Sequence, residues 1–576
     1  MNSIKTYNKK ELYRDLVFLF AFIGAAFFIF WKCRYGVGNV DESFYLTVPY
    51  RLFKGDALFL EEWHLSQMAG VLTLPFVSLY VTLTGGTAGI ILAMRYVCTF
   101  IQCIITLFLY IRLKRINYIG ALLTSISFAL YIPFGIMALS YNSMGIMCQV
   151  VAFVILLTAQ KHKELQFVIA GLFFAAAVLC CPYLAAVYFV YALAVCIKMI
   201  IRKVKKQEFC RECGMWTFKG ALFITAGAAI AAVLFAVFVL SRAPIEGIIK
   251  AFEQIMNDPE HPPLSLSSKT KYFFSSIVKA NSVSPYIYLL LTAITVAIAL
   301  DKGRSKRRVI YFVACSTCVF ALMGIYWSKD YLNHTMWAIN MFAPAAAILS
   351  EKKISKQIIY TVWIPGMLYA YCLHLTSNQV FYAISSASAV STVGSIVIVS
   401  ILLCEITADE LCDSLKYIAV AAFATLMTVQ LYSEGVIRHK NVFWETSIKT
   451  QTVYVADGLH KGIYVTESKL KDYNNAVQNL KVIEEYDAEK VLFLSKNTWY
   501  YLITDYEMST YSAWLAGVNE HTVSRLKAYY EINPEKLPDA VYADEKYAET
   551  AVKFCEVMGY TATEVGGGYI LIPEVK

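Results

Sequence analysis

Hydrophobic residues in this chain gather into long runs that short polar segments separate. A helix needs about 20 mostly apolar residues to cross a bilayer, and many of these runs approach that length. The pattern therefore predicts a polytopic membrane protein. Thirteen runs are predicted to span the membrane: 16–31, 88–110, 117–137, 143–160, 166–181, 183–200, 220–241, 285–300, 309–327, 335–350, 358–375, 380–404 and 417–432.

The positions of lysine and arginine predict how these runs are oriented. Four basic residues between Lys5 and Arg14 precede the first run, and positive charge there places the amino terminus in the cytoplasm. The later basic clusters then fall on the same side, provided that the run 69–84 does not cross. We expect this run, which contains Pro75 and ends at Gly85-Gly86, to lie on the outer leaflet or dip into it.

This topology predicts two long external loops and an external domain. The loops are 33–87, which should contain juxtamembrane helices, and 242–283. Residues 1–432 then form the transmembrane part, and 433–576 an extracytoplasmic domain. Short strand-like segments alternate with helical spacing in that domain, which is typical of an α/β sheet. Strands are expected at 462–466, 491–494, 538–542, 561–564 and 569–572, and helices at 470–480 and 545–558.

The triple glycine Gly566-Gly567-Gly568 lies between the last two expected strands. A phosphate-binding glycine loop opens a helix, and no helix is expected after this one. The sequence therefore favours a hairpin turn.

Composition agrees with the membrane assignment and narrows the partners. With 58% hydrophobic residues and a mean hydropathy of +0.53, the 576-residue chain is too apolar for a soluble globular protein. The net charge of +9 is uneven: 433–576 holds 15 basic and 21 acidic residues, and the remainder holds 36 and 21. A basic membrane part beside an acidic domain does not indicate nucleic-acid binding.

The cysteines do not form a recognisable framework. Most of the 15 lie in apolar segments, where cysteine behaves as a small hydrophobic residue. Cys210 and Cys213 form a single C-x-x-C in a basic loop, whereas a structural zinc ion needs four ligands. The sequence favours an ordinary reduced loop there.

The stretch Gly38-Asn-Val-Asp-Glu-Ser-Phe-Tyr45 directly follows the first hydrophobic run. Carboxylates beside a bilayer are unfavourable unless they are solvated or paired, so they indicate a functional site. Neighbouring residues point in opposite directions on a strand and diverge by about 100° on a helix, so Asp41 and Glu42 should not both face one substrate. We expect Asp41 to act as a base or to orient an acceptor, with Glu42 in support. The alternative is that both only solvate a loop.

Other candidates share the predicted outer face. Arg51, Lys54 and Arg95 could bind a phosphate, or could extend their charges to the interface from apolar surroundings. His64 could orient a substrate, or could be an ordinary hydrogen-bonded residue. The full set of substrate-binding candidates is Tyr45, Arg51, Lys54, His64, Arg95, Tyr141, Asn142, Lys329 and His334.

The last four residues of that set lie in short segments between predicted spans. Tyr141 and Asn142 could hydrogen-bond sugar hydroxyls, although an asparagine there could equally cap a helix. Lys329 could pair with a phosphate or with Asp330, and His334 belongs to the same polar loop.

In architecture the chain resembles the GT-C glycosyltransferases. Within that class it is most similar to the protein O-mannosyltransferase and aminoarabinose-transferase branch. The residues that carry the resemblance are Asp41-Glu42 with Tyr45, the segment Arg51-Leu-Phe-Lys-Gly55-Asp56, and Arg95. The resemblance implies a membrane all-α bundle of about 13 helices with outer juxtamembrane helices and a C-terminal extracytoplasmic α/β domain. It also implies a cell-membrane enzyme that moves a sugar from a polyprenyl-phosphate donor to a glycan, lipid or protein acceptor, with inversion.

Two features depart from that class. The Lys-Pro-Pro-like stretch of the branch is replaced by His64-Leu-Ser-Gln67-Met-Ala-Gly70. Related oligosaccharyltransferases carry a second acidic motif after the third span, and here that segment is Ser140-Tyr-Asn-Ser143. Hard divalent cations prefer several oxygen ligands, usually carboxylates. No second acidic motif therefore supports a divalent metal, which stays an open alternative, and the expected co-substrate is the lipid-phosphate-linked sugar.

The residues themselves fit this chemistry. A carboxylate can accept the proton of an attacking hydroxyl, and cationic side chains can neutralise a phosphate leaving group. Two alternatives stay open. A transporter or flippase would place ionisable groups near the midplane in matched halves. A polymerase or ligase of surface polysaccharide would centre on the loop 242–283.

Overall fold

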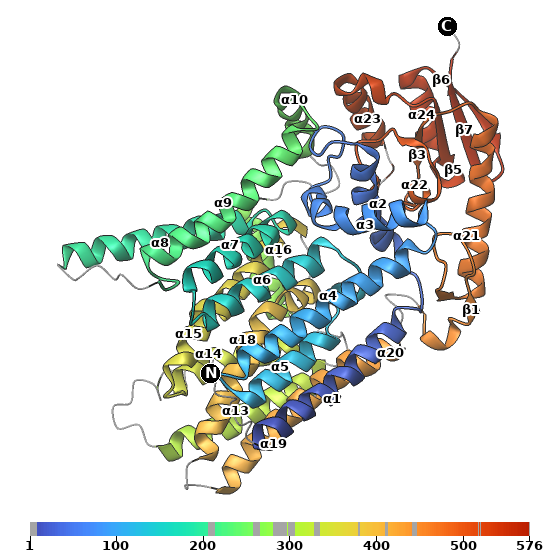
Figure 1. Ribbon diagram of the computed structural model, residues 1–576. Helices are drawn as coiled ribbons and strands as arrows, with labels where there is room; N and C mark the ends of the chain where they lie inside the picture. The colour runs from blue at the N-terminus through green and yellow to red at the C-terminus, as the bar shows by residue number, and fades with distance from the viewer. Residues whose placement is uncertain are drawn as a thin grey trace, which may run out of the picture.

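The computed structural model describes residues 9–205, 213–256, 265–279, 297, 306–327, 334–377, 381–408, 413–440, 446–515, 518 and 520–574. Long, roughly aligned helices form a bundle, and a smaller domain with a sheet covers one end of it (Figure 1).

The bundle and the segments beside it are built from apolar helices joined by short connections. In the first half of the chain the helices are α1 (Lys9–Lys32), α2 (Asn39–Lys54), α3 (Gly70–Thr84), α4 (Ile90–Leu113), α5 (Tyr118–Leu130), α6 (Tyr141–Thr158), α7 (Lys163–Cys180), α8 (Leu184–Val204), α9 (Phe218–Leu240), α10 (Ile245–Met256) and α11 (Leu266–Lys279). In the second half they are α13 (Lys306–Trp327), α14 (His334–Leu349), α15 (Lys353–Ile358), α16 (Ile364–Ser377), α17 (Phe381–Ala387), α18 (Ala389–Thr407), α19 (Asp413–Tyr432) and α20 (Arg438–Lys440).

Among the described residues, ten helices are long and apolar enough to cross a membrane, and three shorter apolar helices accompany them. This supports a multi-pass membrane protein. One detail differs from expectation. The predicted span 117–137 is only the 13-residue α5, which ends before Pro133, because proline disfavours helix at the residue before it. The run 69–84 is an apolar helix with a candidate-span length that packs against α2.

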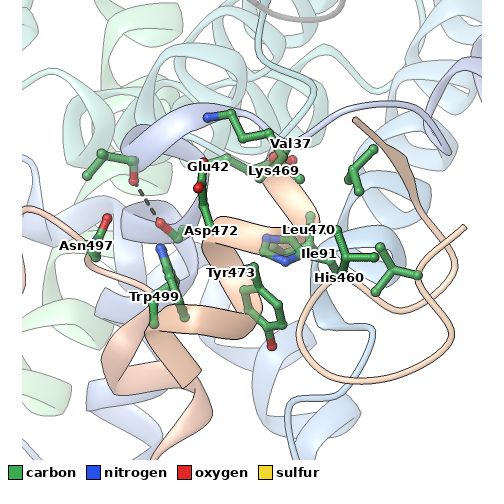
Figure 2. Close-up of a pocket in the computed structure, with 15 residues that line it drawn as sticks. Val37, Glu42, Ile91, His460, Lys469, Leu470, Asp472, Tyr473, Asn497 and Trp499 are labelled. Carbon is green, nitrogen blue, oxygen red and sulfur yellow. Dashed lines mark hydrogen bonds between the residues drawn. The ribbon is translucent and has the colours of Figure 1, made fainter. Parts of the chain in front are cut away.

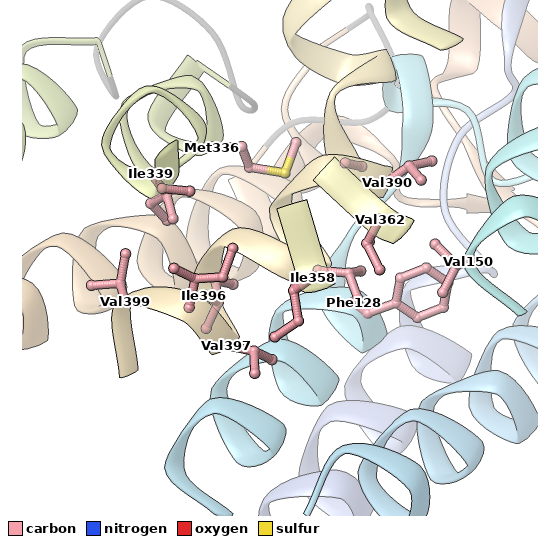
Figure 3. Close-up of a cluster of buried hydrophobic side chains, with 14 of the residues drawn as sticks. Phe128, Val150, Met336, Ile339, Ile358, Val362, Val390, Ile396, Val397 and Val399 are labelled. Atoms are coloured by element: carbon pink, nitrogen blue, oxygen red, sulfur yellow. The ribbon is translucent and has the colours of Figure 1, made fainter. Parts of the chain in front are cut away.

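Helix α18 lies at the centre of the bundle, and nearly all of its residues are buried. Val390, Ile396 and Val397 of α18 belong to one hydrophobic cluster with Ile358, the last residue of α15, and Phe128 of α5 (Figure 3). A helix that is apolar all round is a core helix or a membrane span. The predicted run 380–404 is divided into α17 and α18, while the predicted run 285–300 lies outside the described residues apart from 297.

The C-terminal domain contains a five-stranded sheet in the order β4-β3-β5-β7-β6. β3 pairs in parallel with β4 and β5, whereas β7 pairs antiparallel with β5 and β6. The strands of this sheet are β3 (Lys490–Leu494), β4 (Glu507–Met508), β5 (Ala540–Asp544), β6 (Tyr560–Val565) and β7 (Gly568–Pro573), and a separate pair is formed by β1 (Val453–Tyr454) and β2 (Tyr464–Val465). The helices are α21 (Glu467–Leu480), α22 (Tyr500–Ile503), α23 (Glu520–Ile532) and α24 (Ala548–Met558).

The predicted α/β character of the C-terminal domain is confirmed here, and so is the glycine hairpin. The last helix of the bundle continues past the predicted boundary at 433 as far as Lys440. β6 and β7 pair from Val565–Gly568 outward, and Gly567 adopts a positive φ of 80°, a conformation that glycine accepts without strain. Sequence reasoning missed β1, β4, α22 and α23. β1 and β4 are two-residue strands, too short for an alternating pattern to form.

Both faces of the sheet are buried. Val491 and Phe493 face a cluster shared with α2 and α4, whereas Leu492 and Leu494 face a cluster shared with α23 and α24. The alternation follows the period of two along a strand. One face of the C-terminal domain is therefore packed directly on the first polar helix that follows α1.

Candidate functional site

Helix α2 carries the two candidate carboxylates in its first turn. It begins after Gly38 and ends at Lys54, with Gly55 in the left-handed conformation. Acidic side chains in the first turn interact favourably with the helix dipole. A backbone bridge between Tyr35 and Tyr464 of β2 links the segment before α2 to the C-terminal domain. Helix α2 therefore lies between the bundle and the sheet.

Glu42 is bound by Arg95 of α4 in a two-pronged ion pair. Arg95 Nε donates to Glu42 Oε1 at 2.5 Å and Arg95 Nη2 donates to Glu42 Oε2 at 2.6 Å. The same guanidinium donates to the carbonyls of Cys33 at 2.7 Å and Gly36 at 2.9 Å, and the Gly38 amide donates to Glu42 Oε2 at 2.7 Å. Both side chains are fully buried. Glu42 and Arg95 thus fix the start of α2 to α4.

Asp41 has different surroundings, although it is the next residue. Its side chain is half-buried, and within the described part of the chain it has no hydrogen bond or ion pair. Burial raises the pKa of Asp41 above its ordinary value, because removing the carboxylate from water disfavours its charged form. Asp41 is therefore an available proton acceptor whose charge is not compensated by a cation.

Tyr45 lies one turn after Asp41 on the same face of α2. Its ring contacts that of Tyr141 at the start of α6, with centroids 5.7 Å apart in an edge-to-face arrangement. The Tyr45 hydroxyl interacts with Tyr141 and Asn142. Burial raises the pKa of Tyr45 well above its ordinary value, and the nearby charges of Tyr141 and Asp41 raise it further. Asp41, Tyr45, Tyr141 and Asn142 thus form one polar cluster between α2 and α6.

Asn142 is not the cap of α6. Ser140 is the N-cap, and its side chain and that of Ser143 form a reciprocal capping box. Asn142 is 6% exposed, and its Oδ1 atom has no hydrogen-bond partner. An unsatisfied buried amide oxygen is unfavourable, so a polar ligand at this position would supply a missing donor.

Tyr369 of α16 is a further candidate that sequence reasoning missed. It is fully buried, and its hydroxyl has no hydrogen-bond partner. The hydroxyl lies against Gly145, one turn along α6 from Tyr141. A tyrosine within an apolar run gives no local signal of function, which is why the pattern did not identify it.

Arg51 belongs to a buried network of ion pairs and hydrogen bonds that includes residues of the C-terminal domain. Its guanidinium pairs with Asp56 and with Glu62 at 3.1 Å, and donates to the Thr510 carbonyl at 2.6 Å and the Tyr529 hydroxyl at 3.2 Å. The exposed fraction of the Arg51 side chain is zero. Arg51 and Arg95, suggested as phosphate ligands, are instead enclosed by protein acceptors, and in this arrangement neither faces an open surface.

Lys536 continues this network from the other side. Its ammonium lies 2.7 Å from Asp56, 2.9 Å from Glu61 and 2.6 Å from Glu507. Lys54 instead forms a pair with Asp505, which is 90% exposed. Of the three suggested phosphate ligands on α2 and α4, Lys54 alone keeps partial exposure.

The remaining candidates are placed as follows. His64 accepts from the Ser66 amide at 3.1 Å, and its ring lies 4.6 Å from that of Phe44, as expected for a structural histidine. Lys329 lies outside the described residues, and His334 is described only as the first residue of α14. The described residues contain no group of three or more side chains that could hold a metal ion. Cys213 is buried, and Cys210 lies outside the described residues.

No protein-family model and no curated protein matches the sequence. Two similar solved structures are of an oligosaccharyltransferase from Archaeoglobus fulgidus. One is AglB in complex with an inhibitory peptide and a dolichol-phosphate, at 13% identity and a TM-score of 0.42 over 98% of this chain and 75% of that one. The other is the apo form, at 12% identity and a TM-score of 0.41 over 97% and 75%.

A third similar structure is ArnT from Cupriavidus metallidurans bound to undecaprenyl phosphate. It has 11% identity and a TM-score of 0.37 over 97% of each chain. At TM-scores this low, the likeness assigns no role to any residue of the chain.

Proposed function

We propose that the chain is a GT-C-type membrane glycosyltransferase that moves a sugar from a polyprenyl-phosphate donor to an acceptor at the outer face of the cell membrane. The observation that carries the proposal is the contrast between two adjacent acids. Glu42 is saturated by Arg95 and backbone groups, whereas Asp41 is half-buried and has no ionic or hydrogen-bond partner among the described residues.

In this proposal Asp41 is the catalytic base. It would accept the proton from an acceptor hydroxyl or amine as that group attacks the anomeric carbon of the donor sugar. The bond from that carbon to the phosphate breaks in the same step, and the polyprenyl phosphate leaves with the bonding electrons. A single attack from the face opposite the leaving group inverts the anomeric centre. The raised pKa of Asp41 makes it a stronger proton acceptor at neutral pH.

The neighbouring polar groups support substrate orientation. Asn142 Oδ1 and the Tyr369 hydroxyl are buried and unsatisfied. Asn142 follows Tyr141 in the chain, and the Tyr369 hydroxyl lies against Gly145, one turn along α6. Sugar hydroxyls can donate to the first and can donate to or accept from the second. These groups would hold the reacting sugar near Asp41. No step requires a metal ion.

Asp41→Asn tests the proposal. The variant keeps the size of the side chain and removes its basicity, so transfer from a polyprenyl-phosphate sugar donor should fall by about 10²- to 10⁴-fold. The measurement is transfer by purified protein in lipid nanodiscs, with the melting temperature recorded in parallel. Asp505→Asn is the matched control, since Asp505 is a 90% exposed aspartate. Normal transfer by a folded Asp41→Asn variant would overturn the proposal.

A further inference from the structure

A cavity lies on the other side of α2 from the Asp41 cluster. Its volume is about 270 Å³, and it is enclosed between α2, α4 and the C-terminal domain. On α2 it is lined by Val40, Glu42 and Ser43. Residues 40 and 43 point away from residues 41 and 45 on a helix, because successive residues are separated by about 100°. The cavity is therefore distinct from the cluster formed by Asp41, Tyr45, Tyr141 and Asn142.

Three aromatic rings from the C-terminal domain form a wall of this cavity. The rings of His460 and Tyr473 have centroids 4.7 Å apart, and those of Tyr473 and Trp499 lie 5.1 Å apart. Figure 2 shows the three rings around one space, with Glu42 and Lys469 on the side opposite Tyr473. Tyr473 is held in place because its hydroxyl accepts from the Leu459 amide at 3.1 Å.

Thr498, the residue before Trp499, connects the aromatic wall of the cavity to α2 by hydrogen bonds. The Thr498 hydroxyl donates to the Val40 carbonyl at 3.1 Å and lies 2.6 Å from the Ser43 hydroxyl. The Thr47 hydroxyl donates to the Thr498 carbonyl at 3.2 Å. The aromatic wall and the helix that carries Asp41 are therefore one connected unit. A ligand in the cavity would lie about one helix diameter, roughly 10 Å, from the Asp41 face.

The charges around the cavity balance. Glu42 is already paired with Arg95. Burial lowers the pKa of His460 to about 3, which leaves its ring neutral at physiological pH. The two remaining charged residues, Lys469 and Asp472, have opposite signs and lie on the exposed side of α21. Because no net charge faces the interior, the site does not favour a phosphate or an ammonium group.

We propose that this cavity binds one neutral pyranose unit of the acceptor glycan. A pyranose ring has an apolar face of C–H groups, which suits aromatic rings, and an edge of hydroxyls, which suits the Asn497, Lys469 and Asp472 side chains around the opening. The volume lies just below the usual range for small-molecule sites, as expected for one sugar ring. The assignment of this ring to the acceptor rests on the proposed function; the binding of a neutral sugar does not.

Such a site would help transfer without touching the reacting atoms. Binding energy from a remote part of the acceptor can hold the attacking hydroxyl near Asp41. Loss of the site should therefore raise the acceptor KM and leave kcat nearly unchanged. Loss of Asp41 should lower kcat and leave the acceptor KM nearly unchanged.

Saturation-transfer NMR on the full-length protein in nanodiscs tests the inference directly. The probes are the methyl glycosides of glucose, mannose, galactose and N-acetylglucosamine, with tetramethylammonium and inorganic phosphate as alternatives. We expect at least one glycoside to bind to the wild type and equally to Asp41→Asn. Trp499→Leu should weaken that binding roughly tenfold, as loss of one stacked ring predicts.

Two further variants separate recognition from folding. Asp472→Ala alters an exposed residue on the opening and should weaken binding while the melting temperature stays unchanged. Tyr454→Leu is the matched control, since Tyr454 is a 49% exposed ring of the same domain outside the cavity, and it should bind as the wild type does. Three results would overturn the inference. No glycoside binds to the wild type, or Trp499→Leu and Asp472→Ala bind the glycoside as tightly as the wild type does, or the wild type prefers tetramethylammonium or phosphate to every glycoside. Glycoside binding with unchanged transfer by Asp41→Asn would contradict the proposed function alone.

Discussion

The first turn of α2 places two neighbouring acids in opposite environments. Glu42 accepts three hydrogen bonds, two of them from Arg95. Asp41 is half-buried beside Tyr45 and Tyr141, with no cation paired to it in the part of the chain that the structure describes. A buried carboxylate with all of its partners present stabilises one arrangement of the helices around it. A partly buried carboxylate without a paired cation is instead typical of a functional site. Glu42 therefore fixes the start of α2, and Asp41 is the acid to which our proposal gives the proton transfer.

The largest effect should come from breaking the satisfied pair. Glu42→Ala leaves the Arg95 guanidinium buried without its carboxylate, and loss of one partner from a buried pair costs about 3–5 kcal/mol. We expect the free energy of unfolding to fall by that amount, while Asp41→Asn remains as stable as the wild type or more so. Denaturant titration in mixed micelles measures both. Equal stability of the two variants would remove the distinction between the two acids.

The same contrast can be drawn between two cations of α2. Arg51 is fully buried and contacts the C-terminal domain through Thr510 and Tyr529, whereas Lys54 pairs with the exposed Asp505. Arg51→Met should lower the free energy of unfolding by about 3–5 kcal/mol. Lys54→Met should lower it by no more than about 1 kcal/mol, as expected for a surface pair. Limited proteolysis between 433 and 576 provides an independent measurement, with release of the domain expected only for Arg51→Met.

A smaller effect should appear in the dependence on pH. Because burial raises the pKa of Asp41, the folded protein binds this proton more tightly than the unfolded chain does. Ionised Asp41 therefore destabilises the folded state above its raised pKa, and the penalty disappears below the unfolded value of about 4. Asp41→Asn should be more stable than the wild type at pH 7, and the difference should close as the pH falls toward about 4.

The raised pKa of Asp41 should also appear in the pH dependence of catalysis. The rate kcat/KM should fall as the pH drops through the raised pKa of Asp41, since the base must be ionised. Asp505→Asn should leave that acidic limb unchanged. A profile that is flat across this range would exclude Asp41 as the group that accepts the proton.

Sequence reasoning identified what short-range patterns encode. The apolar runs predicted most of the helices, and the position of the Asp41-Glu42 pair directly after the first run marked it as a candidate site. Divergence of neighbouring residues on a helix predicted that the two acids face different surroundings. These features depend on residues close together in the chain, and periodicity reveals them.

The rest of the site depends on contacts that no local pattern contains. Arg95 pairs with a residue 53 positions away, and Thr498 contacts α2 across more than 450 positions. Arg95 lies near the start of an apolar run, where an arginine could equally well bind a phosphate. Its partner Glu42 therefore became evident only in three dimensions. Tyr369 was hidden for the same reason, because an aromatic residue in a span is usually part of the core.

Native mass spectrometry of the Asp41→Asn variant, purified with its membrane lipids, tests the central claim most directly. If Asp41 accepts the proton during sugar transfer, the variant should retain an intact polyprenyl-phosphate sugar that the wild type, supplied with acceptor, converts to the bare polyprenyl phosphate. A folded variant that carries no such lipid, or that consumes it as fast as the wild type does, would contradict the account.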